Sequence, residues 1–323
     1  MQNRRLLSVI IPAFYAAGYL PALAEAIRSS THVPGEVILV DDASLDNTRE
    51  IASQLGFRVV QNPSQCGPAL ARNRGAAMAQ GDLLFFLDAD CLPQPDTFAK
   101  AIAGLNQEPG IAALIGSYDT RPEANAIVSR FRNLLHAYHH HHGKREAWTF
   151  WGACGIIRKE AFSAVGGFSS AYARPSIEDI ELGLRLKQNG GRILLDPSVQ
   201  VKHRKRWTLV SMIRTDVFDR AIPWTRLLQQ QKSLPNDLNL GWTQRASAAA
   251  ALLAPLAAWW HPWFGAGLLG LVLALNWRFY GFLFQHWGAW GALCSFPLHL
   301  LYFTYSALTF ATIVATDRFR PRA

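Results

Sequence analysis

The feature that most constrains this chain is a run of five apolar residues, 83–87, that ends at two carboxylates, Asp88 and Asp90. Gly81 precedes the run and Pro93 follows it, a pattern typical of a buried strand in a parallel sheet. The end of such a strand opens into the crevice where open α/β sheets bind ligands. Two carboxylates there favour Mg²⁺ or Mn²⁺, which take oxygen ligands and can hold a diphosphate. The alternative is an acidic turn without a ligand.

Upstream of this run, apolar strands and amphipathic helices alternate. Strands are expected at residues 6–11, 36–40 and 57–60, and helices at residues 18–30, 46–55 and 67–79. The first strand is expected to end at Pro12, and the second ends at two further acids, Asp41 and Asp42. This alternation predicts a parallel sheet built from right-handed βαβ units.

Length and charge limit the class of protein. The 323 residues allow an α/β domain, which needs about 200–250 residues, and a second region beside it. The net charge of +9 favours an anionic partner, such as nucleotide phosphates or a membrane surface. The sequence carries no nucleic-acid-binding signature, so a nucleic acid is not expected as the partner. Four scattered cysteines and the lack of a signal-peptide pattern predict a reducing, cytoplasmic location for the catalytic part.

The composition changes sharply in the last part of the chain. Residues 246–316 contain no Asp, Glu or Lys and a single Arg, Arg278. This profile predicts membrane helices, and the alternative is a very apolar core domain. Apolar segments are expected at residues 246–260, 263–284 and 290–315. The first is short and Asn276-Trp277-Arg278 interrupts the second, so we expect a membrane hairpin with an additional interfacial helix.

A basic amphipathic stretch precedes these apolar segments. Eight Lys or Arg residues and two Asp residues lie between Lys202 and Lys232, and apolar residues recur every three or four positions. The stretch is suited to an anionic membrane leaflet, or else it packs on the catalytic domain as an ordinary helix. Pro223 is expected to kink or break it. The histidines at 136 and 139–142 are expected in a solvated loop or helix end.

Several segments of the chain stand in a specific order and spacing. They are SVIIPAFYAAGYL, VDDASLDNT, GPALARNRGAAMAQGDLLFFLDADC, WGACGIIRKEAFSAVGGF and EDIELGLRLKQNGGRILLDPSVQVKH. Over residues 6–205 this set resembles glycosyltransferase family 2. The resemblance implies an α/β GT-A fold, with a mixed, mainly parallel sheet flanked by helices. It also implies inverting transfer of a sugar from a UDP- or GDP-linked donor, with Mn²⁺ or Mg²⁺ as cofactor. The chain has Tyr15-Ala16 where many relatives have Asn-Glu, so a nucleoside contact made there is absent or is made by the backbone.

The resemblance also implies roles for single residues. Donor-binding roles fall on Pro12, Asp41, Asp42, Arg72 and Asp88. Metal-binding roles fall on Asp90, Asp88 and His203, and acceptor-side roles on Trp151 and Gly152. The general base would be Asp179, beside Glu178, because inverting transfer needs a carboxylate that takes the proton of the acceptor hydroxyl.

Each of these roles has a plain structural alternative. Asp41 and Asp42 could form a turn, Arg72 could lie on a solvated helix face, and Trp151 could pack in the core. Two acids in the first turn of a helix suit the helix dipole, and Ser176 could cap that helix.

The expected organisation is a GT-A domain at residues 1–206, an interfacial segment at 207–245 and a membrane region at 246–323 with two or three apolar helices. We therefore expect a glycosyltransferase of the inner, cytoplasmic membrane with its catalytic domain facing the cytoplasm. A lipid or lipid-linked glycan is the expected acceptor. Two alternatives remain: a soluble or polymeric glycan acceptor, and a non-catalytic nucleotide-binding membrane scaffold.

Overall fold

The structure is a computed structural model that describes residues 6–230 and 241–317. The chain divides into two compact units. Unit 1 comprises Met1–Asp119 and Gly143–Arg204, and unit 2 comprises Thr120–His142 and Lys205–Ala323. The boundary expected after residue 206 thus falls close to a boundary between units. Residues 120–142, however, belong to unit 2, although they lie within the range expected for the GT-A domain.

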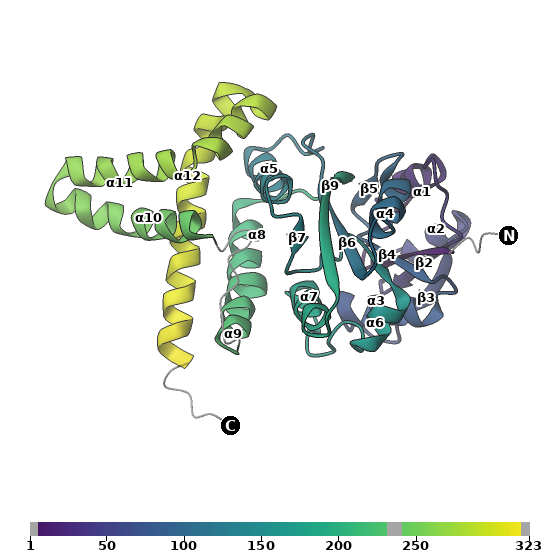
Figure 1. The fold of residues 1–323 in the computed structure, drawn as a ribbon. Coiled ribbons are helices and arrows are strands. Elements are labelled where there is room, and N and C mark those ends of the chain that lie inside the picture. The colour runs from purple at the N-terminus through teal and green to yellow at the C-terminus, as the bar shows by residue number, and fades with distance from the viewer. Residues whose placement is uncertain (1–5, 231–240, 318–323) are drawn as a thin grey trace. The chain divides into compact units, whose positions relative to one another are not determined.

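Unit 1 is built on one mixed sheet (Figure 1). Its strands are β1 (Leu7–Ala13), β2 (Glu36–Asp41), β3 (Arg58–Gln61), β4 (Leu83–Leu87), β5 (Cys91–Pro93), β6 (Ile111–Tyr118), β7 (Glu146–Ala147), β8 (Cys154–Arg158) and β9 (Arg192–His203). Their order is β3-β2-β1-β4-β8-β6-β9-β5, and β7 pairs with β9.

The first part of this sheet matches the predicted parallel arrangement. Strands β3, β2, β1 and β4 pair in parallel, whereas β8 enters antiparallel between β4 and β6. All five residues of β4 are buried, because the strand lies inside the sheet. One boundary was predicted wrongly: β1 continues through Pro12, which stands opposite Val40, to Ala13.

Helices cover both faces of the sheet in unit 1 (Figure 1). They are α1 (Leu20–Arg28), α2 (Thr48–Gln54), α3 (Pro68–Met78), α4 (Thr97–Leu105), α6 (Lys159–Ala164) and α7 (Glu178–Gln188). Helix α3 packs on β1 and β2, and α4 packs on β6 and β9. The positions of α1, α2 and α3 agree with the helices predicted from the sequence.

Unit 2 is helical over its described residues. Its helices are α5 (Ile127–His141), α8 (Leu209–Arg214), the π-helical stretch η1 (Thr215–Ala221), α9 (Ile222–Gln230), α10 (Trp242–Trp260), α11 (Pro262–Leu275) and α12 (Trp277–Asp317). A buried polar contact joins three of them. Asp216 of η1 accepts hydrogen bonds from Arg132 of α5 (2.5 Å) and from the Tyr305 hydroxyl of α12 (2.6 Å).

The apolar end of the chain differs from the three segments that were predicted. Helix α11 ends at Leu275 and α12 begins at Trp277, so the expected segment 263–284 is broken at Asn276. Within the described part of the chain, α12 is the one helix long and apolar enough to cross a membrane. It changes direction at Gly288, whose φ is 78°.

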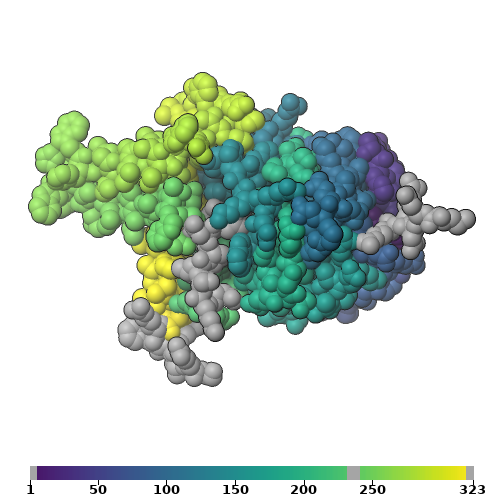
Figure 2. Space-filling model, in the orientation of Figure 1, coloured from purple at the N-terminus to yellow at the C-terminus, as the bar shows by residue number. Residues whose placement is uncertain are grey.

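Helices α10 and α11 form a hairpin with an aromatic tip. Trp259, Trp260 and Trp263 are 93%, 86% and 78% exposed. Figure 2 shows this hairpin, in green, as a projection of unit 2. Each helix is apolar, yet α11 has 14 residues. At 1.5 Å per residue it is shorter than the hydrocarbon core of a bilayer, which is about 30 Å thick.

Two local predictions for unit 2 hold only in part. Pro223 does not break the helix, because it lies in the first turn of α9, where its missing N–H costs little. The π-helical stretch η1 stands directly before it. The histidines at 136 and 139–141 lie in the last turns of α5, which agrees with the helix end that was one of the two expectations, although His140 is buried and not solvated.

Candidate active site

The Asp88–Asp90 turn is held in place by the pairing of β5 with β9, two strands that are far apart in the sequence. The Cys91 N–H closes the turn by donating to the Asp88 carbonyl (3.0 Å). Strand β5 then pairs antiparallel with the end of β9, which sets Cys91 opposite His203. The Arg204 N–H donates to the Asp90 carbonyl (2.9 Å) and continues this pairing. The register therefore brings two predicted metal ligands, Asp90 and His203, together.

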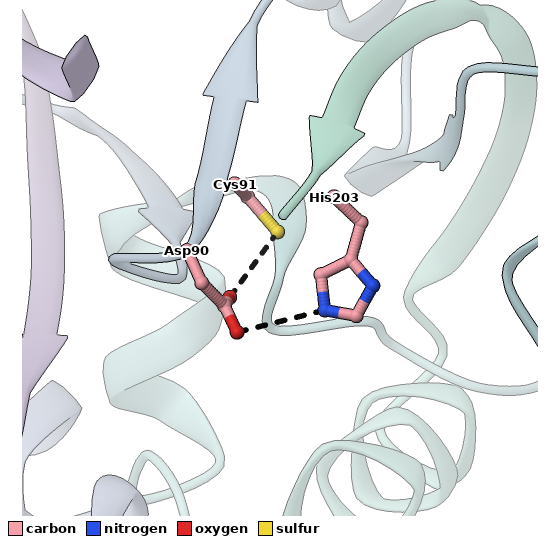
Figure 3. A group of neighbouring side chains, drawn as sticks. All are labelled: Asp90, Cys91 and His203. Carbon is pink, nitrogen blue, oxygen red and sulfur yellow. Dashed lines mark hydrogen bonds and ion pairs between the residues drawn. The ribbon is translucent and has the colours of Figure 1, made fainter. Parts of the chain in front are cut away.

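Asp90 and His203 form a donor set suited to a divalent cation. The Asp90 Oδ2 atom lies 3.6 Å from His203 Nε2 (Figure 3). The His203 ring is stacked on Tyr118, with 4.3 Å between centroids and 7° between planes, so its direction is fixed. A carboxylate and an imidazole that face each other suit Mn²⁺, and the Asp90 side chain remains 23% exposed. These residues fit the predicted cofactor, and Asp90 and His203 would hold it.

Asp88 turns toward a different partner. Its Oδ1 atom accepts a hydrogen bond from Arg72 Nη2 at 2.7 Å, and Arg72 Nη1 donates to Glu178 Oε1 at 2.9 Å. Arg72 is buried and its guanidinium also lies over the Phe168 ring. Desolvation raises the pKa of Asp88, Arg72 opposes that rise, and Asp90 adds to it. Arg72 thus connects the strand end to the first turn of α7 and is not on a solvated helix face.

The first turn of α7 also carries Asp179, the predicted base. Its Oδ2 atom accepts from the Gly152 N–H (3.2 Å) and its Oδ1 atom from the Ile180 N–H (2.8 Å). Burial and the adjacent Glu178 raise the pKa of Asp179 to about 6. The expected Ser176 cap is wrong, because Ile177 is the N-cap residue and Glu178 Oε2 instead accepts from the Ser176 N–H (2.8 Å).

Gly152 has a structural reason to be glycine. A Cβ atom at this position would lie 2.9 Å from the Arg72 Cζ atom. The absence of a side chain at Gly152 therefore makes room for the Arg72 guanidinium. The predicted role of Gly152 on the acceptor side remains a prediction. The neighbouring Trp151 is nearly buried, and its ring packs edge-on against Tyr118 at 4.9 Å.

The predicted donor end is formed by the ends of β1 and β2. Asp41 is fully buried and accepts from the Ser44 N–H. Asp42 accepts from the N–H groups of Cys66 (3.0 Å) and Gly67 (2.8 Å), so it shapes the loop before α3. The predicted roles of Asp41, Asp42 and Pro12 in donor binding remain predictions.

The Tyr15-Ala16 departure lies at an unusual backbone conformation. Tyr15 has a φ of 52°, in the left-handed region that Asn tolerates better than Tyr. The N–H groups of Tyr15 and Ala16 donate to Ser44 Oγ and Thr48 Oγ1, each at 2.9 Å. These two donors are engaged within the chain, while the Tyr15 side chain is 48% exposed.

Sequence reasoning missed two residues of this site. Tyr118 fixes the His203 ring, and Cys91 places its thiol beside Asp90. Tyr118 ends an apolar strand, and its place beside His203 depends on the β6–β9 pairing. Cys91 stands directly after the acidic pair, so that position was the one available signal.

Known proteins resemble both the sequence and the fold. The family model described as glycosyl transferase family 2 matches residues 8–166, and a model described as N-terminal domain of galactosyltransferase matches residues 132–207. An uncharacterized glycosyltransferase of Haemophilus influenzae is 31% identical over 57% of this chain and 62% of its own length. The succinoglycan biosynthesis protein ExoA of Rhizobium meliloti is 28% identical, over 63% of this chain and 64% of its own length. The chain thus spans less than two thirds of these relatives.

Solved structures show the same fold. A mannosyltransferase from Pyrobaculum calidifontis, PcManGT, in complex with GDP-Man and Mn²⁺, has a TM-score of 0.61 and 21% identity. The match covers 98% of this chain and 89% of that one. GalNAc-T7 with UDP, GalNAc and Mn²⁺ has a TM-score of 0.53 and 17% identity, covering 77% and 51%.

The sheet order and the paired strand-end acids define a GT-A-type glycosyltransferase fold. Residues 8–166 form a domain of glycosyltransferase family 2, which is the part of the chain that the family model matches.

Proposed function

We propose that this chain transfers a sugar, with inversion, from a UDP- or GDP-linked donor to a hydroxyl of a membrane-held lipid or lipid-linked glycan. The observation that carries the proposal is the position of Asp179. Its carboxylate is held by two backbone N–H groups, and Arg72 connects the adjacent Glu178 to Asp88 at the strand end. This juxtaposition puts a base with a pKa near 6 beside the acids of the predicted donor site.

Each residue has a separate task in this proposal. Asp90 and His203 would hold Mn²⁺ or Mg²⁺, which when bound neutralises charge on the diphosphate. Arg72 is engaged by Asp88 and Glu178, and it positions both carboxylates. Asp179 accepts the proton of the acceptor hydroxyl as the hydroxyl oxygen attacks the anomeric carbon. The bond from that carbon to the nucleoside diphosphate breaks on the opposite face, and the nucleoside diphosphate leaves. Glu178 orients the turn that carries Asp179, because its two oxygens accept from Arg72 and from the Ser176 N–H.

Unit 2 supports attachment to a membrane. Helix α12 is long and apolar enough to span a bilayer, and the exposed tryptophans of the α10–α11 tip suit a membrane interface. The basic residues of the 202–232 stretch favour an anionic leaflet, which is cytoplasmic in most membranes. We therefore place the catalytic unit on the cytoplasmic side of the inner membrane, with the acceptor delivered from the bilayer.

The proposal is tested with detergent-purified full chain, Mn²⁺ and a panel of UDP- and GDP-sugars, with and without lipid or soluble glycan acceptors. Asp179→Asn is the matched control. Transfer to a lipid acceptor, lost in the control, is expected. Transfer to soluble glycans alone would support the alternative acceptor. Nucleotide binding without turnover in the wild type would support a non-catalytic scaffold.

A further inference from the structure

We propose that Cys91 is a third metal ligand beside Asp90 and His203, and that Zn²⁺ therefore binds this site more tightly than Mn²⁺ and inhibits the enzyme. The inference concerns the metal site of the proposed function and rests on its location. It adds a sulfur ligand and a preference between metals.

The three side chains converge on one point from three places in the fold (Figure 3). Asp90 comes from the turn after β4, Cys91 from β5 and His203 from the end of β9. The ligand atoms all lie within 4.8 Å of one another, and this group is the one such cluster among residues 6–230 and 241–317. The β5–β9 register keeps them together, since Cys91 and His203 are directly opposed.

The distances come close to those around a tetrahedral ion. The Cys91 Sγ atom lies 3.7 Å from Asp90 Oδ1, and the second oxygen, Oδ2, lies 3.6 Å from His203 Nε2. With one ligand atom from each residue, the separations are within 4.8 Å. Zinc binds sulfur at about 2.3 Å and nitrogen or oxygen at about 2.0–2.2 Å, so tetrahedral ligands are separated by roughly 3.3–3.8 Å. Small side-chain movements would complete the set, and the exposed edge of Asp90 leaves a path for the ion.

A bound cation would lie between the Cys91 sulfur and Asp90, where the thiol now makes a hydrogen bond. In this structure the thiol donates to Asp90 Oδ1. On binding, the ion forms a bond to sulfur while the S–H bond breaks, and the proton leaves to the buffer. A soft thiolate favours Zn²⁺ over Mn²⁺. Inhibition follows because a four-coordinate ion with three protein ligands retains one position, fewer than a diphosphate and water need.

The test uses Co²⁺ as a spectroscopic substitute for Zn²⁺, on metal-free full chain in detergent without donor. A thiolate-to-cobalt charge-transfer band is expected in the wild type and in two control variants, Cys66→Ser and Cys154→Ser. The band should vanish in Cys91→Ser, and Zn²⁺ affinity should fall there by more than the roughly 10- to 100-fold that loss of an outer-shell partner costs. Mn²⁺ affinity should change much less.

Other outcomes separate this inference from the proposed function. Co²⁺ binding without the band, or a band that survives in Cys91→Ser, would overturn the inference. Mn²⁺-dependent transfer without any Co²⁺ or Zn²⁺ binding would overturn it and leave the proposed function standing. A charge-transfer band in a protein that shows no sugar transfer would support the inference and count against the proposed function. If circular dichroism shows that Cys91→Ser does not fold, the same measurements are made on Cys91→Ala. Inhibition of wild-type transfer by Zn²⁺ is then measured as well, and its absence would overturn the inference.

Discussion

At the scale of single residues, Asp88 and Asp179 show how neighbours divide work between identical side chains. Asp88 is paired with the buried guanidinium of Arg72, so its charge is committed to a structural contact. Asp179 accepts hydrogen bonds from the neutral backbone N–H groups of Gly152 and Ile180. These two N–H groups fix the direction of the carboxylate without pairing its charge, and a general base needs such a fixed position.

Replacing Asp179 with Asn should separate chemistry from binding. Turnover should fall about 10²- to 10⁴-fold, the usual contribution of a positioned base. Affinity for the nucleoside diphosphate should change little, since the contacts of Asp179 are on α7 and at Gly152. Initial rates and isothermal titration measure the two quantities. Asp90→Asn is the comparison, because it should lose donor affinity in Mn²⁺. Near-normal turnover of Asp179→Asn would assign the base to Glu178.

The raised pKa of Asp179 predicts a pH dependence with a definite sign. Its pKa rises from 3.8 to about 6 on folding, so the carboxylate is neutral below that range and acts as a base above it. The rate should therefore increase as pH rises through about 6, and Asp179→Asn should lack this limb.

The same shift affects stability. The neutral form is favoured in the fold, so its stabilising contribution is present below about pH 4 and is lost as pH rises through 6. The Asn variant should gain stability relative to the wild type over that window, as thermal melts at pH 4 and pH 8 would measure. An equal difference at both pH values would contradict the shift.

At the scale of elements, the sequence was most informative where structure is local. The apolar runs of β1, β2 and β4 and the helices between them were predicted, because hydrophobic periodicity and turn residues act over short distances. The pairing of β5 with β9 was not, because it joins a three-residue strand to a distant one. That pairing places Cys91 in the site, and the equally distant pairing of β6 with β9 places Tyr118 there, which explains why both were missed.

The approach of Gly152 to Arg72 gives a prediction at this scale. In Gly152→Ala the new Cβ atom would meet the Arg72 guanidinium, which is held on both sides by carboxylates and has little room to move. Overpacking of this kind costs about 1–3 kcal/mol, and here it should also displace Asp88 and Glu178. Thermal stability and turnover should both fall. Gly18→Ala is the control, because its Cβ would meet no atom within 4 Å. Equal effects of the two substitutions would refute the steric account.

At the scale of the whole molecule, unit 2 is not formed by the C-terminal part of the chain alone. Helix α5 lies between two unit 1 segments in sequence, yet it packs with the C-terminal helices. Phe131 is fully buried and faces Phe279, while Tyr138 contacts Phe279 and Phe282. The composition change at residue 246 could not reveal this, because an amphipathic helix does not specify its partner.

Truncation after Gln244 therefore has a different expected result from the clean release of a soluble domain. Removing α12 uncovers the α5 face that carries Phe131 and Tyr138, and burial of a side chain such as Phe131 contributes about 1.5–3 kcal/mol. The truncated chain should aggregate without detergent, and high salt should not release it from membranes, since the exposed surface is apolar. Adding Phe131→Gln and Tyr138→Gln to the truncated chain should restore a monodisperse protein in size-exclusion chromatography. A truncated wild-type sequence that is monodisperse in plain buffer would show that α5 does not depend on α12.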